Sequence, residues 1–265
     1  MTEQFKTNTD ENYFLKAEGL TMHFPAASDA LGRPTSWIHA ADDVSFAVPK
    51  GKTLGVVGES GCGKSTVGKM LLDIYRPTGG KIFYEGKDIT ALSPKERRPY
   101  VKKMQLVWQD PYSSLDPRLR AGDIIAEPID NFRLAASRAE RAEKVERLMQ
   151  MCGLYPEMAT HYPHQFSGGQ RQRICIARAL ATDPEFVVCD EAVSALDVSI
   201  QAQIINLLKD LQDELRLTYL FISHDLNIVH FISDEIIVMY LGQIVERGTM
   251  ETVYRNRAHP YTKAL

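Results

Sequence analysis

The chain has 265 residues, of which 44% are hydrophobic and 25% charged, and this composition predicts a soluble globular protein with one large domain or two small ones. Its 31 Lys and Arg residues against 34 Asp and Glu residues give a net charge of −3, which disfavours a nucleic-acid binder or a protein that adsorbs to membrane surfaces. No apolar run approaches the roughly 20 residues needed to cross a bilayer, and the polar start is not a secretory signal, so a cytosolic location is expected.

Short β-branched and aromatic runs alternate with helical patterns, which predicts an α/β domain. Strands are expected at residues 14–24, 44–48, 53–57, 81–84, 104–108, 185–189, 218–222 and 235–240. Residues 25–36, rich in Pro, Ala and Ser, are expected to form a loop. Between Pro111 and Pro184 the pattern turns helical, which predicts a helical insertion in the α/β core.

Two helices are predicted with the clearest boundaries. Residues 137–153 begin with a capping box of Ser137 and Glu140 and end at Gly153. Residues 199–216 carry apolar side chains at helical spacing, so one face of that helix is expected to pack against the sheet.

The four cysteines lack metal-ligand spacing, and we expect reduced thiols. Cys152, Cys175 and Cys189 lie in apolar segments, where a small hydrophobic side chain packs well. Cys62 lies in a glycine-rich loop instead.

That loop, GESGCGKS at residues 58–65, follows an expected strand and precedes a helix, as a phosphate-binding loop does. Glycines let backbone N–H groups turn toward a polyphosphate, Lys64 is expected to reach the β- and γ-phosphates, and the Ser65 hydroxyl is expected to bind Mg²⁺. The competing interpretation is a glycine-rich turn with an exposed lysine. The predicted nucleotide-binding residues are Gly58, Glu59, Ser60, Gly61, Cys62, Gly63, Lys64, Ser65 and Thr66.

A second chemical motif follows the apolar strand at 185–189, which ends in the carboxylates Asp190 and Glu191. This is a Walker B pattern, in which Asp190 holds the hydration shell of Mg²⁺ and Glu191 polarises the attacking water as general base. A solvated strand end would give the same pattern. The position downstream of the phosphate-binding loop favours the catalytic interpretation.

The segment QFSGGQRQRICIARAL, residues 165–180, places glycines at the start of a helix and predicts a second anion site. Here the sequence resembles the ATP-binding cassette (ABC) family, whose LSGGQ signature contacts the γ-phosphate bound by the opposite subunit of a head-to-tail dimer. The matching signature residues are Ser167, Gly168, Gly169 and Gln170. The resemblance covers nearly the whole chain, because Gln109 (Q-loop), Asp197 (D-loop) and His224 (switch histidine) follow in the family's order.

The resemblance implies an α/β fold with a P-loop NTPase (RecA-like) core, an antiparallel β subdomain and a helical subdomain insertion. Residues 1–265 would form one nucleotide-binding domain, with the core at 14–110 and 183–245, the helical signature subdomain at 111–182 and a shortened C-terminal tail at 246–265.

The resemblance also assigns site roles. Lys64, Gln109, Glu191 and His224 would be catalytic, Mg²⁺ would be held by Ser65, Gln109 and, through water, Asp190, and Asp197 would act across the dimer. Trp37 is predicted to stack on adenine; Phe24 in that role and simple packing of Trp37 remain open.

The C-terminal tail at 246–265 indicates which subfamily of ABC ATPases the chain resembles. His259–Thr262 reads HPYT, and with WQDPYSSLDPR it resembles the oligopeptide and dipeptide importer ATPases. The implied function is ATP-driven import of peptides or related small solutes, with ATP and Mg²⁺ as cofactors. The implied partners are a second ABC ATPase subunit, identical or homologous, two transmembrane permease subunits and, indirectly, an extracytoplasmic solute-binding protein, with no nucleic acid. The location would be peripheral, at the cytoplasmic face of the inner membrane.

Two positions depart from the family's commonest pattern: Phe166 stands where Leu is usual, and Ala192 follows Glu191 where Pro is usual. Because Pro would restrain the backbone beside Glu191, we expect a competent but slower site. The alternative functions are a soluble ABC ATPase acting in DNA repair or translation, and a small-molecule kinase. This chain lacks the coiled-coil insertion or second cassette that is usual in DNA-repair and translation ATPases. A small-molecule kinase would leave the FSGGQ segment unexplained.

Overall fold

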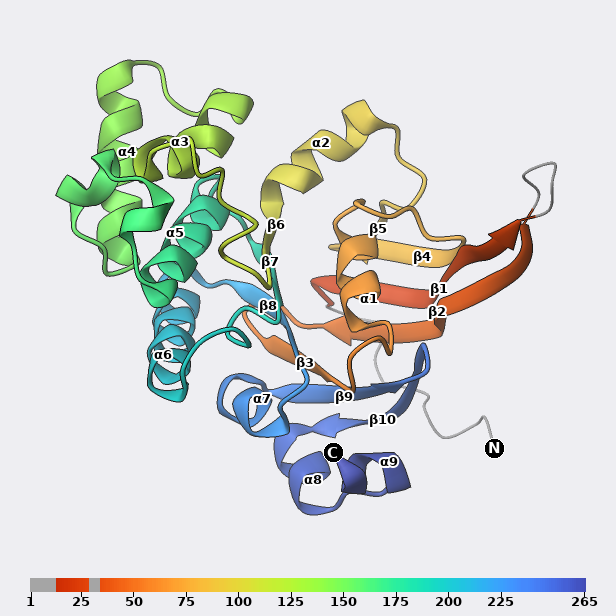
Figure 1. Ribbon diagram of the computed structural model, residues 1–265. Helices are drawn as coiled ribbons and strands as arrows, with labels where there is room; N and C mark the ends of the chain where they lie inside the picture. The colour runs from red at the N-terminus through yellow and green to blue at the C-terminus, as the bar shows by residue number, and fades with distance from the viewer. Residues whose placement is uncertain (1–12, 29–33) are drawn as a thin grey trace.

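Two β-sheets frame the molecule (Figure 1). The computed structural model describes residues 13–28 and 34–265. The larger sheet has six strands in the order β10-β9-β3-β8-β7-β6, and all neighbours are parallel except β10, which runs antiparallel to β9. Its strands are β3 (Thr53–Val57), β6 (Met104–Val107), β7 (Phe186–Asp190), β8 (Thr218–Ser223), β9 (Glu235–Tyr240) and β10 (Gln243–Thr249).

The smaller sheet is antiparallel, in the order β2-β1-β4-β5. Its strands are β1 (Leu15–Ser28), β2 (Pro34–Val48), β4 (Gly79–Tyr84) and β5 (Lys87–Asp88). The predicted loop at 25–36 is wrong at both ends, because β1 and β2 continue to pair there, with Pro25 opposite Trp37. Pairing between the two strands overrides a composition typical of loops. Residues 29–33 of that prediction lie outside the described residues.

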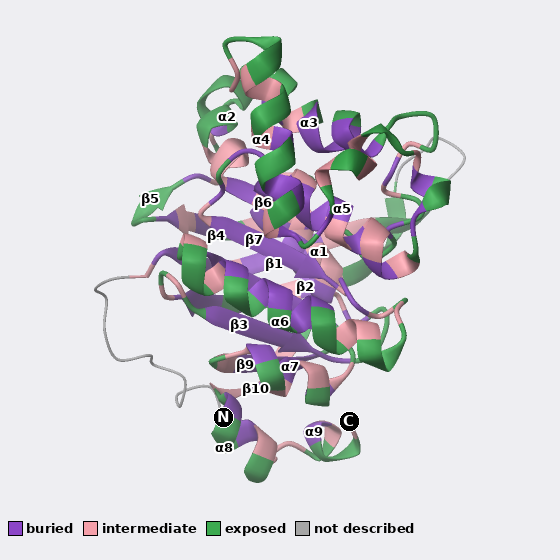
Figure 2. Cartoon of the chain, turned by 90° about the vertical axis from the view of Figure 1, so that its left-hand side faces the viewer, coloured by how far each residue is buried: buried purple, intermediate pink, exposed green. Residues whose placement is uncertain are grey.

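The strands β3, β7 and β8 in the middle of the six-stranded sheet are buried on both faces, as parallel strands usually are. Val188 and Leu220 face a core that contains α1 (Lys64–Leu71) and side chains of the smaller sheet. Val187 and Tyr219 face a second core built from helices on the other side, including α6 (Val198–Leu215). In Figure 2 these strands are coloured as buried for most of their length. Alternating residues of one strand thus belong to different cores, which holds the strand ends in fixed positions.

The segment between β6 and β7 is helical, as the sequence predicts, and none of its described residues is in a strand. Its elements are α3 (Ala121–Phe132), α4 (Arg138–Met151), the 3₁₀ turns Pro156–Thr160 and Pro163–Gln165, and α5 (Gly168–Leu180). Ser137 caps α4 by accepting a hydrogen bond from the backbone N–H of Glu140 at 3.1 Å, as predicted. Figure 1 shows this helical group on the opposite side of the molecule from the antiparallel sheet.

The other helices are α2 (Pro94–Lys103), α7 (Leu226–Ile232), α8 (Met250–Arg255) and α9 (Pro260–Ala264). The predicted helix at 199–216 is α6. Strand β10 was not predicted; it covers residues 243–249 and brings the start of the expected tail into the sheet. None of the helices in the described part of the chain is both long enough and apolar enough to span a bilayer.

Candidate functional site

The phosphate-binding loop connects β3 to α1, and the buried ammonium of Lys64 at its end has no counter-charge in the part of the chain that the structure describes. Lys64 is 3% exposed, and its Nζ donates hydrogen bonds to the carbonyl oxygens of Gly58 at 2.7 Å and Glu59 at 2.8 Å. Among the described residues no carboxylate lies within ion-pair distance of this ammonium. A buried charge without a counter-charge is costly, so the loop is suited to an anion.

The backbone of the loop accounts for its glycines. Gly58, Gly61 and Gly63 have φ values of 155°, 82° and 104°, which L side chains adopt only with strain. A Cβ at Gly63 would lie 1.9 Å from the carbonyl oxygen of Ala40 in β2. Gly63 also caps α1 without any side-chain hydrogen bond, so the N-terminus of α1 is free to receive a phosphate group.

Ser65 and Asp190 meet beside this loop. The Ser65 hydroxyl donates to Asp190 Oδ1 at 2.7 Å, and Asp190 is 4% exposed at the end of β7. Burial raises the pKa of the Asp190 carboxyl above its usual range, while the hydrogen bond from Ser65 acts in the opposite direction. A hydroxyl and a carboxylate are the hard oxygen ligands that Mg²⁺ prefers, so these residues fit that ion.

Glu191 contacts two residues that follow neighbouring strands. Its Oε2 accepts a hydrogen bond from Gln109 Nε2 at 2.9 Å and lies 3.4 Å from His224 Nδ1. The three residues follow β7, β6 and β8, which are adjacent in the sheet. Glu191 itself has a φ of 47°, and such strain in a residue other than glycine is concentrated at functional sites. Gln109, Glu191 and His224 therefore lie just after the carboxyl ends of parallel strands, where ligands bind α/β sheets. Lys64 begins α1 at the end of the loop that follows β3.

The signature residues lie elsewhere. Ser167 is exposed and begins α5, where its Oγ accepts from the Gln170 N–H at 3.3 Å and its own N–H donates to Gln170 Oε1 at 3.0 Å. A Cβ at Gly169 would lie 2.7 Å from Ile200 Cγ2, so α5 packs closely against the start of α6. Asp197 is exposed there as the N-cap of α6. None of the hydrogen bonds between described residues joins the signature to the loop at 58–65.

Comparisons with known proteins agree with this geometry. The family model for the ABC transporter matches residues 41–194. The chain belongs to the ABC transporter family. It is 50% identical to the oligopeptide transport ATP-binding protein AppF of Bacillus subtilis, over 98% of this chain and 79% of that protein. It is 51% identical to the dipeptide transport ATP-binding protein DppF of Haemophilus influenzae, over 100% of this chain and 80% of that protein.

Among solved structures, the ABC ATPase is similar to the ATP-binding cassette MJ0796, a dimer in a post-hydrolysis state bound to ADP and Pi. The TM-score is 0.79 at 29% identity, over 89% of this chain and 98% of that chain. The family resemblance, the P-loop NTPase fold class and the ATPase activity predicted from the sequence are confirmed. The relatives do not favour the alternative of a DNA-repair or translation ATPase.

The adenine-stacking residue of the ABC ATPase stays a prediction. Trp37 is 51% exposed, and it lies three residues before Ala40, which is the β2 residue that touches the loop. At the usual rise per strand residue this is roughly 10 Å away. The alternative, Phe24, packs its ring against Tyr75 with centroids 5.4 Å apart.

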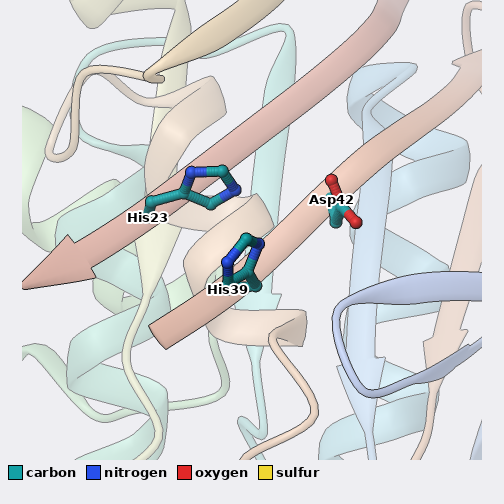
Figure 3. A group of neighbouring side chains, drawn as sticks. All are labelled: His23, His39 and Asp42. Carbon is teal, nitrogen blue, oxygen red and sulfur yellow. The ribbon is translucent and has the colours of Figure 1, made fainter. Parts of the chain in front are cut away.

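A pair of histidines on β1 and β2 was not predicted from the sequence. His23 of β1 and His39 of β2 are cross-strand partners whose ring centroids are 4.0 Å apart. Figure 3 shows them with Asp42, and one ligand atom of each lies within 4.8 Å of the others. Asp42 also accepts a hydrogen bond from Gln243 at 3.1 Å. Only the pairing register of β1 and β2 could have placed these residues together.

The two departures from the family pattern are both buried. Phe166 is 4% exposed and its ring lies 6.0 Å from that of His161, so the larger aromatic side chain is accommodated in the core beside the signature. Ala192 is 1% exposed and directly follows the strained Glu191. Their effect on turnover remains a prediction.

Proposed function

We propose that this chain is the ATP-hydrolysing subunit of an importer of peptides or related small solutes. The observation that carries the proposal is the arrangement of Gln109, Glu191 and His224 beside the buried Lys64 and the Ser65 hydroxyl. The transported class comes from the relatives, which are named as oligopeptide and dipeptide transport ATP-binding proteins. The HPYT segment and the near full-length identity support the same subfamily.

Within the site, Lys64 would hold the β- and γ-phosphates of ATP while residues 58–66 surround them. Ser65, Gln109 and, through water, Asp190 would hold Mg²⁺, which when bound neutralises phosphate charge. Glu191 would accept a proton from the attacking water. Both neighbours of Glu191 contact Oε2, and among the described residues no hydrogen bond reaches Oε1, so Oε1 would accept the proton. His224, whose side chain is 54% exposed, would reach the γ-phosphate.

The second half of the site would come from another subunit. Ser167, Gly168, Gly169 and Gln170 begin α5 in the helical group, whereas the loop they would complete begins α1 (Figure 1). The exposure of Ser167 and of Asp197 supports a head-to-tail dimer in which each chain supplies its signature to the other's ATP. The similarity to a dimeric cassette supports the same arrangement.

The permease would dock on the helical part, residues 111–182, near Gln109. A cleft of about 730 Å³ separates the core from this part, and its lining includes Trp108, Gln109, Glu127 and Asp190. Movement of α3 relative to the core would therefore shift the positions of the catalytic residues directly. Tyr112, 63% exposed, lies just beyond Gln109 and offers an anchor for the partner. We place the chain at the cytoplasmic face of the inner membrane, with two permease subunits and, indirectly, a solute-binding protein.

The test is co-purification from detergent-solubilised membranes of the source cell, with the retained subunits identified by mass spectrometry. We expect two multi-span permease subunits and an ATPase rate that rises when the solute-binding protein is supplied with peptide. Recovery of the chain without any membrane subunit would contradict the importer assignment. Recovery with ribosomes or DNA-repair proteins would support the alternative function.

A further inference from the structure

The HPYT segment has no part in the chemistry proposed above, yet it contacts the phosphate-binding loop. Tyr261 lies on α9, which Figure 1 places beneath β9 and β10. Its hydroxyl oxygen accepts a hydrogen bond from the backbone N–H of Glu59 at 2.7 Å. The two residues are 202 positions apart in the sequence, so only the complete fold brings them together.

The peptide group that Tyr261 contacts is also the one that holds the lysine. The N–H of Glu59 and the carbonyl of Gly58 belong to one peptide unit, and that carbonyl accepts a hydrogen bond from Lys64 Nζ at 2.7 Å. The unit thus connects a phenol on one side to an ammonium on the other. Hydrogen bonds in a row polarise and strengthen one another. The hydroxyl therefore orients the carbonyl that positions Lys64.

Tyr261 is itself held firmly. Glu246 of β10 is buried, and its two carboxylate oxygens accept hydrogen bonds from the N–H groups of Ala258 at 2.8 Å and His259 at 3.0 Å. The Tyr261 ring lies 4.5 Å from that of Tyr240 at the end of β9. A carboxylate bound to two backbone N–H groups fixes the entry to α9 through charge-assisted hydrogen bonds. The phenol is thereby fixed to the six-stranded sheet.

The turn between β9 and β10 supports the same loop from a second point. The N–H of Gly242 donates to the Cys62 carbonyl at 3.0 Å. A Cβ at Gly58 would lie 2.3 Å from the Met239 carbonyl oxygen, so β9 presses directly on the loop. The Tyr261 contact therefore belongs to a broader support of the loop by the C-terminal part of the chain.

We propose that Tyr261 is a positioning residue for ATP binding. Its hydroxyl fixes the Gly58–Glu59 peptide and, through it, the ammonium of Lys64, so the C-terminal segment helps to set the affinity for ATP. This role concerns the nucleotide and does not depend on what the importer transports.

The test compares Tyr261→Phe with Tyr254→Phe, a matched loss of one hydroxyl in the same region. The Tyr254 hydroxyl donates to Asn227 Oδ1 at 3.2 Å and does not reach the loop. For Tyr261→Phe we expect the Kd and KM for ATP to rise about fivefold, with kcat and the unfolding temperature of the nucleotide-free chain nearly unchanged. Tyr254→Phe should match the parent chain. Equal ATP affinity in the two variants would overturn the proposal.

A double-variant cycle tests whether the effect passes through the lysine. Equilibrium binding of labelled ATP is measured for Lys64→Ala with and without Tyr261→Phe. Because the proposed role is to position Lys64, removal of the hydroxyl should cause no further loss of affinity in the Lys64→Ala chain. An equal fold-loss in both backgrounds would overturn the route through Lys64.

Discussion

Two glycine-rich segments at helix N-termini, the loop at 58–65 and the signature at 167–170, have similar local chemistry but different surroundings. The loop lies between β2 and β9, contains a buried ammonium and leads into α1, which has no side-chain cap. The signature is exposed at Ser167, and α5 already has a complete capping box. The loop is therefore suited to bind an anion within its own chain. The signature instead satisfies its own backbone hydrogen bonds and is exposed at Ser167.

Under the proposed function, this difference would let one chain contain two phosphate-contacting motifs without forming a complete ATP site. Binding affinity should depend chiefly on the loop, while hydrolysis should depend on both segments, one from each subunit. Variants that separate ATP binding from ATP turnover therefore test this difference between the loop and the signature.

The largest effect is expected for Glu191→Gln, which removes the proposed base on the loop side. Turnover should fall about 1,000-fold, because proton removal from water by a positioned carboxylate is lost. ATP affinity should be retained, since Lys64 and Ser65 are unchanged. Steady-state phosphate release and equilibrium ATP binding measure the two quantities. Substantial remaining hydrolysis would exclude Glu191 from this role.

On the signature side, Ser167→Ala should lower turnover of the dimer about 100-fold by removing a γ-phosphate contact in trans. The lost cap should also cost about 1 kcal/mol of stability, which thermal unfolding would detect. ATP binding by the isolated chain should stay unchanged. Weakened ATP binding by the isolated chain would contradict the separation of the two segments.

A tenfold effect is expected on the recovery of permease subunits with this chain. Tyr112→Ala should reduce recovery of the membrane subunits by about tenfold, because an exposed aromatic anchor is removed. Tyr155→Ala removes a comparably exposed tyrosine, 72% exposed, which precedes the 3₁₀ turn Pro156–Thr160, and should have no effect. Quantitative mass spectrometry of the purified complexes compares the two. Equal recovery with both variants would move the docking surface away from Tyr112.

The smallest effect concerns thiol reactivity in the two parts of the chain. Burial raises the pKa of Cys152, after α4, and of Cys189, in β7, to about 12. Both thiols should stay protonated in the folded chain at pH 8 and resist alkylation, whereas the unfolded chain, with ordinary pKa values, should react. The same shift implies a loss of stability as pH rises from about 9 toward 12, because only the unfolded chain ionises at the lower value. Labelling of Cys152 alone in the folded chain would mean that the helical part opens independently.

The places of the candidate site residues in the fold were predictable because the motifs that contain them are local. A strand followed by GESGCGKS, and a strand ending in Asp190 and Glu191, specify their own geometry, and parallel pairing then brings Gln109 and His224 to Glu191. The four cysteines are all buried, and three of them were expected to be so.

What the sequence did not predict depends on long-range pairing. The extension of β1 and β2 through a Pro- and Ser-rich stretch, the His23–His39 pair and strand β10 all follow from register between distant segments. The Tyr261–Glu59 hydrogen bond is of the same kind, because no local pattern signals a contact across 202 residues. Trp37 was predicted from distance along the chain, and β2 places it away from the residue that touches the loop.

We expect this chain to bind ATP by itself but to hydrolyse it only when a second subunit supplies a signature. The most direct measurement follows turnover per chain together with mass by analytical ultracentrifugation, at saturating ATP and Mg²⁺, over a range of subunit concentrations. We expect negligible turnover in the monomer, although it binds ATP, and a rate that rises with the fraction of dimer. Full turnover by the monomer would exclude the need for a second signature.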